Sequence, residues 1–195
     1  MLSLACCINM CGAIHATDLA VVGVHTAVPK VIDETFEAQC ETPTTMSGCP
    51  TGAIRRHPDK DVKSVVINDE KCMYCGNCYT ICPSLPIANP ERDGVIVYVG
   101  GKCANVRTPS MLSRVAVPFI PNNPPRWPEV VGVLKTIIET YAKDARAPER
   151  VGEWIERIGY EKFFERTGLP FVGQCIDDFG AGARSTLRAS TQFKW

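Results

Sequence analysis

A run of four cysteines near the middle of the chain constrains its fold more than any other feature. The run, CMYCGNCYTICP, contains Cys72, Cys75, Cys78 and Cys82, and a proline follows the last of them. This C-x2-C-x2-C-x3-C-P pattern is the bacterial spacing for a [4Fe–4S] cluster. A tight loop brings the first three thiolates to three corners of one cubane, whereas the fourth cysteine ligates another cluster in proteins that hold two. The run therefore predicts three ligands and requires a fourth from a distant Cys-Pro pair.

That fourth ligand is predicted to be Cys49, which precedes a proline in SGCPTGAI. A second cluster built symmetrically would need cysteines four, seven and ten residues before Cys49, where the chain has Thr45, Thr42 and Gln39. We therefore expect one cluster here and interpret Cys82 as a buried free thiol. Zinc is the alternative for grouped cysteines, but zinc ribbons use paired C-x2-C knuckles instead of this run.

Three further cysteines, Cys6, Cys7 and Cys11, lie close to the start of the chain in ACCINMC. A thiolate-bound site usually has four ligands, so these N-terminal cysteines lack one. The segment 1–29 contains no lysine or arginine, and Asp18 is its one carboxylate. Because soluble proteins avoid large exposed apolar patches, we expect this segment to pack against a cofactor and a partner, or to be preceded by more chain.

Composition narrows the class of protein. The chain has 195 residues and eleven cysteines, an odd number, and no secretion signal is recognisable, which favours reduced thiolates over a disulfide framework. The 21 basic and 21 acidic residues leave no net charge for nucleic-acid binding or for a basic membrane-binding surface. The longest apolar runs, such as LAVVGV, are too short to span a bilayer. We expect a cytoplasmic protein with neither nucleic-acid binding nor membrane insertion.

Local patterns predict an α+β protein. The middle module is expected to have helices at 32–40 and from Thr42 towards Cys49, a strand at 62–68 and a linker at 83–93. Strands are expected at 94–101 and 114–121, followed by a helix at 127–146 and two short helices at 149–159 and 160–168. The apolar face of the long helix is predicted to contain Val130, Leu134, Ile137, Ile138 and Tyr141, and the core to contain Trp154, Phe163 and Phe164.

Several longer motifs carry a family resemblance. CCINMCGAIH, GGKCAN, FIPNNPPRWP, ERVGEWIERIG and the terminal STQFKW make the chain similar to the beta subunit of dissimilatory sulfite reductases, in the C-terminal half of that subunit. The resemblance implies the C-terminal half of a siroheme domain with an inserted ferredoxin-type [4Fe–4S] domain. The implied domains are 1–28, a siroheme- and cluster-binding segment, 29–92, the ferredoxin-type insert, and 93–195, the rest of the siroheme domain. It also implies that the chain is a fragment of a longer subunit.

The same resemblance implies the cofactors and the reaction. A complete subunit would hold siroheme and two [4Fe–4S] clusters and would reduce sulfite towards sulfide with six electrons. The N-terminal cysteines would ligate the siroheme-coupled cluster, with Cys11 as the catalytic thiolate that bridges cluster and siroheme iron, and the remaining ligand would lie upstream. Cys49, Cys72, Cys75 and Cys78 would hold the second cluster, which relays electrons.

Partners and alternatives complete the expectations. The resemblance implies an alpha subunit in an alpha2-beta2 assembly, a small swinging-arm thiol protein and sulfite as substrate. Lys102, Arg107 and Arg114 could contact siroheme carboxylates but are better interpreted as solvated charges, and His15, His25 and His57 as structural or exposed. A stand-alone single-cluster electron carrier remains an alternative function, and the related alpha subunit an alternative identity. The direction of catalysis, the electron donor and the roles of Cys40, Cys103 and Cys175 stay open.

Overall fold

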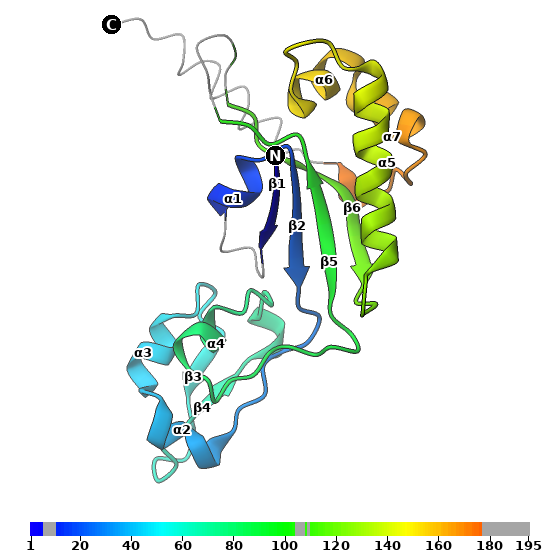
Figure 1. Cartoon of the computed structure of the whole chain (residues 1–195). Coiled ribbons are helices and arrows are strands. Elements are labelled where there is room, and N and C mark those ends of the chain that lie inside the picture. The colour runs from blue at the N-terminus through cyan, green and yellow to red at the C-terminus, as the bar shows by residue number, and fades with distance from the viewer. Residues whose placement is uncertain (6–10, 104–107, 109, 177–195) are drawn as a thin grey trace, which may run out of the picture. The chain divides into compact units, whose positions relative to one another are not determined.

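The computed structural model describes residues 1–5, 11–103, 108 and 110–176. The chain divides into two compact units, which are treated separately (Figure 1): unit 1 comprises Met1–Gly23 with Val95–Trp195, and unit 2 comprises Val24–Gly94. The expected insert at 29–92 lies within unit 2. Within the described residues, no helix combines the length and the apolar character needed to cross a bilayer.

Unit 1 is built on a four-stranded sheet with the order β1-β2-β5-β6 (Figure 1). The strands are β1 (Leu2–Ala5), β2 (Leu19–Val24), β5 (Gly94–Val99) and β6 (Arg114–Pro121). β1 and β2 run parallel, and the short helix α1 (Cys11–His15) lies between them in the chain. Beyond the end of β5, the Gly100 amide donates a hydrogen bond to the Asp18 carbonyl just before β2, at 2.8 Å. The end of β5 therefore lies beside the start of β2, as in an antiparallel pair.

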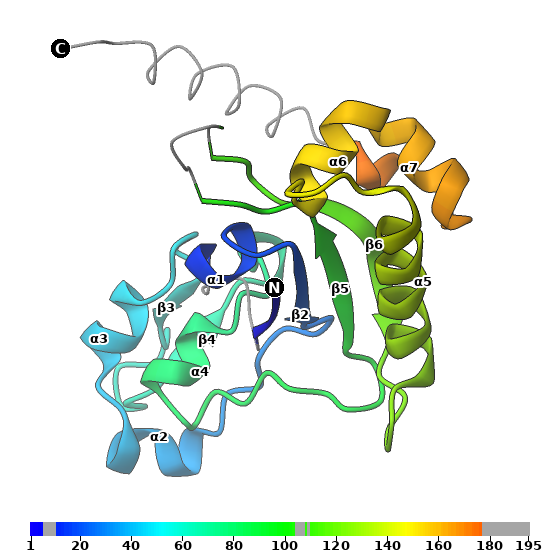
Figure 2. The same ribbon diagram turned by 45° about the horizontal axis from the view of Figure 1, so that its top comes forward.

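Alternate residues of these strands face opposite sides of the sheet. In β2, Leu19 and Val21 join the larger core, whereas Ala20 and Val22 join a smaller cluster with Ile14 of α1. Three helices complete the larger core on one face (Figure 2): α5 (Pro128–Asp144), α6 (Val151–Ile158) and α7 (Tyr160–Thr167). β2 is therefore buried on both faces over its first four residues.

The helices of unit 1 confirm most of the predicted core. Trp154, Phe163 and Phe164 are buried in it as predicted. The prediction for Ile138 is wrong, because its side chain is 50% exposed. Val130, Leu134, Ile137 and Tyr141 follow one another at steps of four, three and four and face the core. Ile138 is rotated by about 100° from Ile137 and so leaves that face.

Unit 2 packs short elements around a small core. Its elements are α2 (Asp33–Gln39), α3 (Thr42–Ser47), β3 (Ile54–Arg56), β4 (Val65–Ile67), a 3-10 turn at Asp69–Lys71 and α4 (Asn77–Ile81). β3 and β4 form an antiparallel pair in which Ile54 lies opposite Ile67. α3 has a proline in its first turn, where a missing amide hydrogen costs nothing. The core gathers Phe36, Ile54, Val65, Cys78, Cys82 and Leu85.

One cysteine prediction needs correction. Cys82 is fully buried, as expected, but it is not a free thiol: it forms a disulfide with Cys40. Cys40 directly follows α2, and Cys82 directly follows α4. The folded chain therefore brings together two cysteines that stand 42 residues apart in the sequence. Spacing alone does not reveal such a pairing.

Candidate metal centre

Unit 2 contains a cavity lined by the cysteines that the sequence grouped as ligands, Cys49, Cys72, Cys75 and Cys78. These four are called the cavity cysteines below. Most of the remaining lining is apolar and includes Pro29, Ile54, Ile67 and Ile87. Four sulfur donors in an apolar surrounding are the donor set that iron–sulfur clusters use.

The loop that carries Cys72 and Cys75 turns sharply twice before it enters α4, whose first turn carries Cys78. Cys72 follows the 3-10 turn, and the side chain of Asn68 accepts a hydrogen bond from the Lys71 amide at 3.3 Å to cap that turn. Tyr74 and Gly76 then adopt positive φ angles of 55° and 74°. The chain changes direction at these two left-handed residues, one of which lies between Cys72 and Cys75 and the other between Cys75 and Cys78.

Space beside Gly76 is tight, in addition to the left-handed conformation of this residue. A Cβ atom on Gly76 would lie 3.2 Å from Nε2 of His25, which packs behind the loop. His25 is held in turn by Asp93, whose Oδ2 lies 3.0 Å from His25 Nδ1. Asp93 also accepts hydrogen bonds from the backbone amides of Thr26 and Asn89 at 3.0 Å and 2.8 Å. The cavity loop therefore rests on a polar support that sequence motifs did not reveal.

Cys49 approaches the cavity from the segment just after α3. The Ala53 amide donates a hydrogen bond to Cys49 Sγ at 3.2 Å, and the Thr51 hydroxyl lies 3.5 Å from the same sulfur. Burial raises the pKa of Cys49, but hydrogen bonds from the Thr51 side chain and from backbone amides, including that of Ala53, bring this pKa below its ordinary value. A thiol with donors aimed at its sulfur is suited to the thiolate state that binds metal.

Cys78 shows why the four thiols need a positive partner. Burial raises the pKa of Cys78 to about 11, and repulsion from the Cys75 and Cys72 thiolates adds to that rise. Close thiolates in an apolar cavity repel one another, and bound iron would relieve that repulsion. Among the described residues, no three histidine, cysteine or acidic side chains converge on one metal ion. In a cubane each thiolate binds a different iron, so the donor set fits a cluster better than a single ion.

The side chains of the N-terminal cysteines lie outside the described part of the structure, and two of the three histidines lie away from the cavity. Cys6 and Cys7 fall outside the described residues, and the side chain of Cys11, the first residue of α1, is also not described. His15 lies 2.9 Å from the Ser113 hydroxyl, and the His57 ring accepts a hydrogen bond from the Asp59 amide. The structure places neither histidine in the lining of the cavity.

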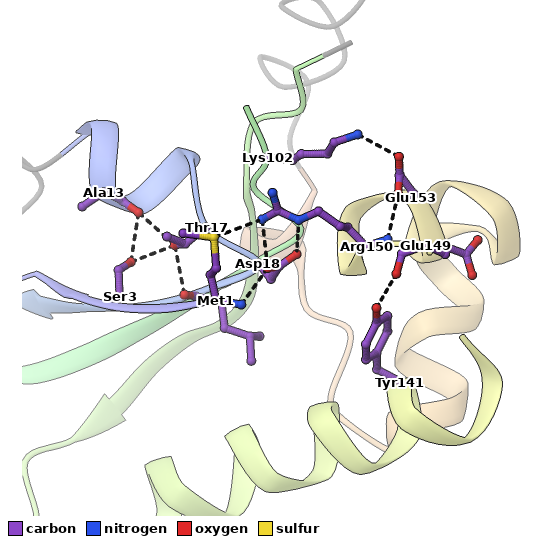
Figure 3. Close-up of polar contacts among 11 residues, drawn as sticks. Met1, Ser3, Ala13, Thr17, Asp18, Lys102, Tyr141, Glu149, Arg150 and Glu153 are labelled. Carbon is purple, nitrogen blue, oxygen red and sulfur yellow. Dashed lines mark hydrogen bonds and ion pairs between the residues drawn. The ribbon is translucent and has the colours of Figure 1, made fainter. Parts of the chain in front are cut away.

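The basic residues of unit 1 are engaged by carboxylates, which corrects part of the interpretation as solvated charges. The Lys102 side chain is 1% exposed and donates to Glu153 at 2.7 Å (Figure 3). Burial alone would raise the pKa of Glu153, but its hydrogen bonds, among them those from Lys102 and the Arg150 amide, lower this pKa to about 2. Arg114 pairs with Glu156 and is largely buried. Arg107 lies outside the described residues.

Figure 3 shows a second carboxylate beside this pair. The guanidinium of Arg150 donates to both oxygens of Asp18, at 3.0 Å and 2.9 Å. Arg150 directly precedes α6 and Asp18 directly precedes β2, so the pair links the start of the helix to the sheet. The charges of this region therefore neutralise one another within the fold.

The sequence of the chain matches a known protein family. The model for the nitrite and sulphite reductase 4Fe-4S domain matches residues 2–173. The chain belongs to this family. The match covers both units and supports an iron–sulfur cluster as the cofactor.

Among the relatives of this chain are subunits of dissimilatory sulfite reductases. The chain is 51% identical to the dissimilatory-type sulfite reductase subunit beta of Archaeoglobus fulgidus and 50% identical to that of Nitratidesulfovibrio vulgaris. Both alignments cover the whole chain, and it spans about half of the relatives' length, 53% and 52%. A dissimilatory-type subunit alpha from Allochromatium vinosum is 28% identical over 84% of this chain and 40% of that protein.

A solved structure also shares the fold. The crystal structure of dissimilatory sulfite reductase I matches with a TM-score of 0.70 and 24% sequence identity. The match covers 91% of this chain and 44% of the other. At that identity the likeness concerns the fold, and it agrees with the predicted α+β class.

Proposed function

We propose that the chain is part of the beta subunit of a dissimilatory sulfite reductase, an oxidoreductase that reduces sulfite towards sulfide with six electrons. The observation that carries this proposal is the identity of about half of all residues with two beta subunits over the entire chain. The cavity of unit 2 adds a chemical reason, since four thiols line one apolar space. Reduction by six electrons needs centres that deliver electrons one at a time.

In this proposal the cavity cysteines hold a [4Fe–4S] cluster that relays electrons. Cys72 and Cys75 come from the loop, Cys78 comes from the first turn of α4, and Cys49 comes from the segment just after α3. The amide and hydroxyl directed at Cys49 Sγ would stabilise its thiolate and tune the potential of a bound cluster. The cavity that these four cysteines line supports a shared site, and the spacing of the cysteine run supports a [4Fe–4S] cluster as its occupant.

The N-terminal cysteines are assigned to the siroheme-coupled cluster. Cys6, Cys7 and Cys11 would be ligands, and Cys11 would be the thiolate shared with the siroheme iron. Siroheme would supply the iron that binds sulfite sulfur and accepts electrons. The support is the family match together with the beta-subunit relatives. The main basic groups for sulfite are placed in the part of the relatives that this chain does not span.

The partners follow from the same assignment. An alpha subunit in an alpha2-beta2 assembly is proposed because relatives named alpha also match the chain, at 28% and 29% identity. The small swinging-arm thiol protein, sulfite and a cytoplasmic location complete the proposal by resemblance to the family.

One observation favours the alternative of a single-cluster electron carrier. The described residues bring together one complete set of four cysteines, in unit 2. A carrier would need that set alone and would reduce no sulfite. The two functions therefore differ in whether the N-terminal cysteines serve a cofactor.

The first experiment tests the ligands by anaerobic reconstitution with iron and sulfide. Cys49→Ser and Cys72→Ser should abolish the cluster of unit 2, because each leaves one corner of the cubane without a thiolate. Cys82→Ser should retain it, and Cys103→Ser, at an exposed cysteine outside the cavity, is the matched control. Iron and sulfide counts provide the readout. Loss of the cluster in Cys82→Ser, or its persistence in Cys72→Ser, would overturn the assignment.

The second experiment separates the enzyme from the carrier. The protein is expressed from its complete gene with an alpha partner, and absorption spectra and sulfite reduction by reduced viologen are measured. The proposal expects a siroheme band and turnover, and it expects Cys11→Ser to uncouple siroheme from its cluster. Iron–sulfur absorbance with no siroheme band would favour the carrier.

A further inference from the structure

The disulfide between Cys40 and Cys82 stands apart from the proposed cluster. Its Cα atoms are 5.4 Å apart, within the usual range for bonded cysteines. Cys82 is fully buried, whereas Cys40 is partly exposed. Neither cysteine lines the cavity that holds the other four of unit 2. The pair is therefore a separate sulfur site with one partly exposed member.

Hydrogen bonds hold the two paired segments together independently of the disulfide. The amides of Lys30 and Ile32 donate to the carbonyls of Pro86 and Ser84 at 3.1 Å and 3.0 Å. The Ser84 hydroxyl also donates to the Gln39 side chain, at 3.2 Å. Residues 30–40 thus run beside residues 82–86, and the disulfide closes one end of this contact. Breaking the S–S bond would leave the two thiols close enough to form it again.

The surrounding cysteines indicate that the bond is reversible. The four other cysteines of unit 2 line one cavity, and cysteines bind metal only as reduced thiolates. Conditions that keep those thiols reduced also favour reduction of a disulfide, and disulfides that occur in reducing surroundings are usually transient or redox-sensing. A ligand role for the pair lacks donors, since the described residues offer no third metal-binding side chain beside them.

We propose that Cys40 and Cys82 form a second redox-active site of unit 2, which exchanges two electrons and two protons with dithiol reductants. A thiolate of the reductant attacks Sγ of Cys40, which breaks the S–S bond and leaves the electron pair on Cys82, where a proton is taken up. The second thiolate of the reductant then attacks the mixed disulfide and releases Cys40, which is also protonated. The reductant leaves as a disulfide, so the electrons balance.

The site is placed where its state affects the cavity elements. Cys82 directly follows α4, the helix that contains Cys78. Cys40 lies between α2 and α3, and Cys49 follows α3. The disulfide therefore ties the two segments that bring ligands to the cavity. The redox reaction rests on the cysteine pair alone, whereas any effect on a cluster rests on the proposed function.

The test is a redox titration of the full chain, purified anaerobically, in mixtures of dithiothreitol and its cyclic disulfide. Acid quenching, differential alkylation and peptide mass spectrometry report the fraction of Cys40 linked to Cys82. The expected result is a reversible two-electron transition, in which the ratio of oxidised to reduced pair changes tenfold per about 30 mV. The iron content of each sample is measured separately, so failure of the proposed cluster is distinguishable from failure of this site.

Hydrogen exchange provides a second measurement on the same samples. Peptides covering 30–40 and 79–87 should exchange at least about threefold faster after reduction, while peptides from α5 in unit 1 stay unchanged. Cys40→Ser should remove this redox difference, and Cys103→Ser should preserve it. The proposal is overturned if Cys40 and Cys82 are both alkylated under oxidising conditions, or if their bond resists excess dithiothreitol in the folded protein. Equal exchange in the two states would overturn the structural effect.

Discussion

Asn77 donates a hydrogen bond from its side-chain amide to the backbone carbonyl of Gly48, with Nδ2 and the oxygen 2.6 Å apart. Asn77 lies between Cys75 and Cys78, and Gly48 immediately precedes Cys49. The contact therefore fixes the distant fourth cysteine against the segment that carries the other three. It is a direct structural link between the two segments that supply the cavity.

Asn77→Ala is expected to weaken this link. The substitution leaves the Gly48 carbonyl without its donor, which typically costs about 1–2 kcal/mol. If this cost destabilises the folded state with its cluster bound, iron–sulfur absorbance in urea should be lost roughly 5- to 30-fold faster than in the protein without the substitution. Thr44→Ala, which removes an exposed hydrogen bond to Glu41, is the control and should change the rate little. Equal rates in both variants would contradict the bracing role of Asn77.

Gly76→Ala should destabilise unit 2 more than Gly52→Ala. Both glycines have positive φ angles, which cost an alanine about 1–2 kcal/mol. At Gly76 the new methyl group also meets His25, whereas at Gly52 the nearest atom is the flexible end of Arg55 at 3.7 Å. Hydrogen exchange of unit 2 peptides measures both variants. Combining Gly76→Ala with His25→Ala should recover about 0.5–3 kcal/mol of the added loss, and strict additivity would refute the steric explanation.

Acid should destabilise unit 2 through Asp93. Burial raises the pKa of this carboxyl, but hydrogen bonds from the Asn89 amide, His25 and Thr26 outweigh burial and lower it. A depressed folded-state pKa contributes stability that is present above the unfolded-state pKa of about 3.9 and is lost as pH falls through the folded value. In Asp93→Asn, the protection of unit 2 peptides from hydrogen exchange should therefore fall less steeply below about pH 4 than in the protein with Asp93. Asp69→Asn, at an exposed site, should retain the steep loss.

Unit 1 should depend on the buried pair of Lys102 and Glu153. Removing the lysine in Lys102→Met takes the Lys102 ammonium away from a largely buried carboxylate, and breaking a buried ion pair costs up to about 3–5 kcal/mol. The double variant with Glu153→Gln should recover part of that cost. Fluorescence follows unfolding selectively, because the three tryptophans all belong to the segments of unit 1. Lys135→Met, at an exposed lysine, is the control.

The sequence predicted the elements with strong periodicity or clear boundaries. The long helix at α5 has an apolar repeat and a proline in its first turn, and α6 and α7 each end at a glycine. The strands at β5 and β6 were also predicted, and their bounds agree with the structure within two residues. Cys72, Cys75 and Cys78 were grouped by their spacing and Cys49 by its Cys-Pro pair, and the structure places all four around one cavity.

The remaining features depend on long-range packing. β2 is a continuous apolar run buried on both faces, so it lacks the alternation that identifies a strand, and β1 is only four residues long. Ile138 was assigned to the core because a helical repeat leaves one neighbouring position ambiguous. The Cys40 pairing and the support of His25 by Asp93 join residues 42 and 68 positions apart, and local patterns do not encode such contacts.

The strand order has a consequence for how the chain reaches its native state. β2 and β5 are neighbours in the sheet, yet the whole of unit 2 separates them in sequence. Pairing them from an unstructured chain means closing a loop of about seventy residues, which slows folding because the entropy is lost before the contacts form. If unit 2 folds first, the hydrogen bond from the Thr26 amide to Asp93 Oδ1, at 3.0 Å, holds the two ends of this unit together and shortens the loop that remains to be closed. The insert would then act as a folding template for its host sheet, and circular permutation within unit 2 should slow the appearance of the buried Trp154 signal.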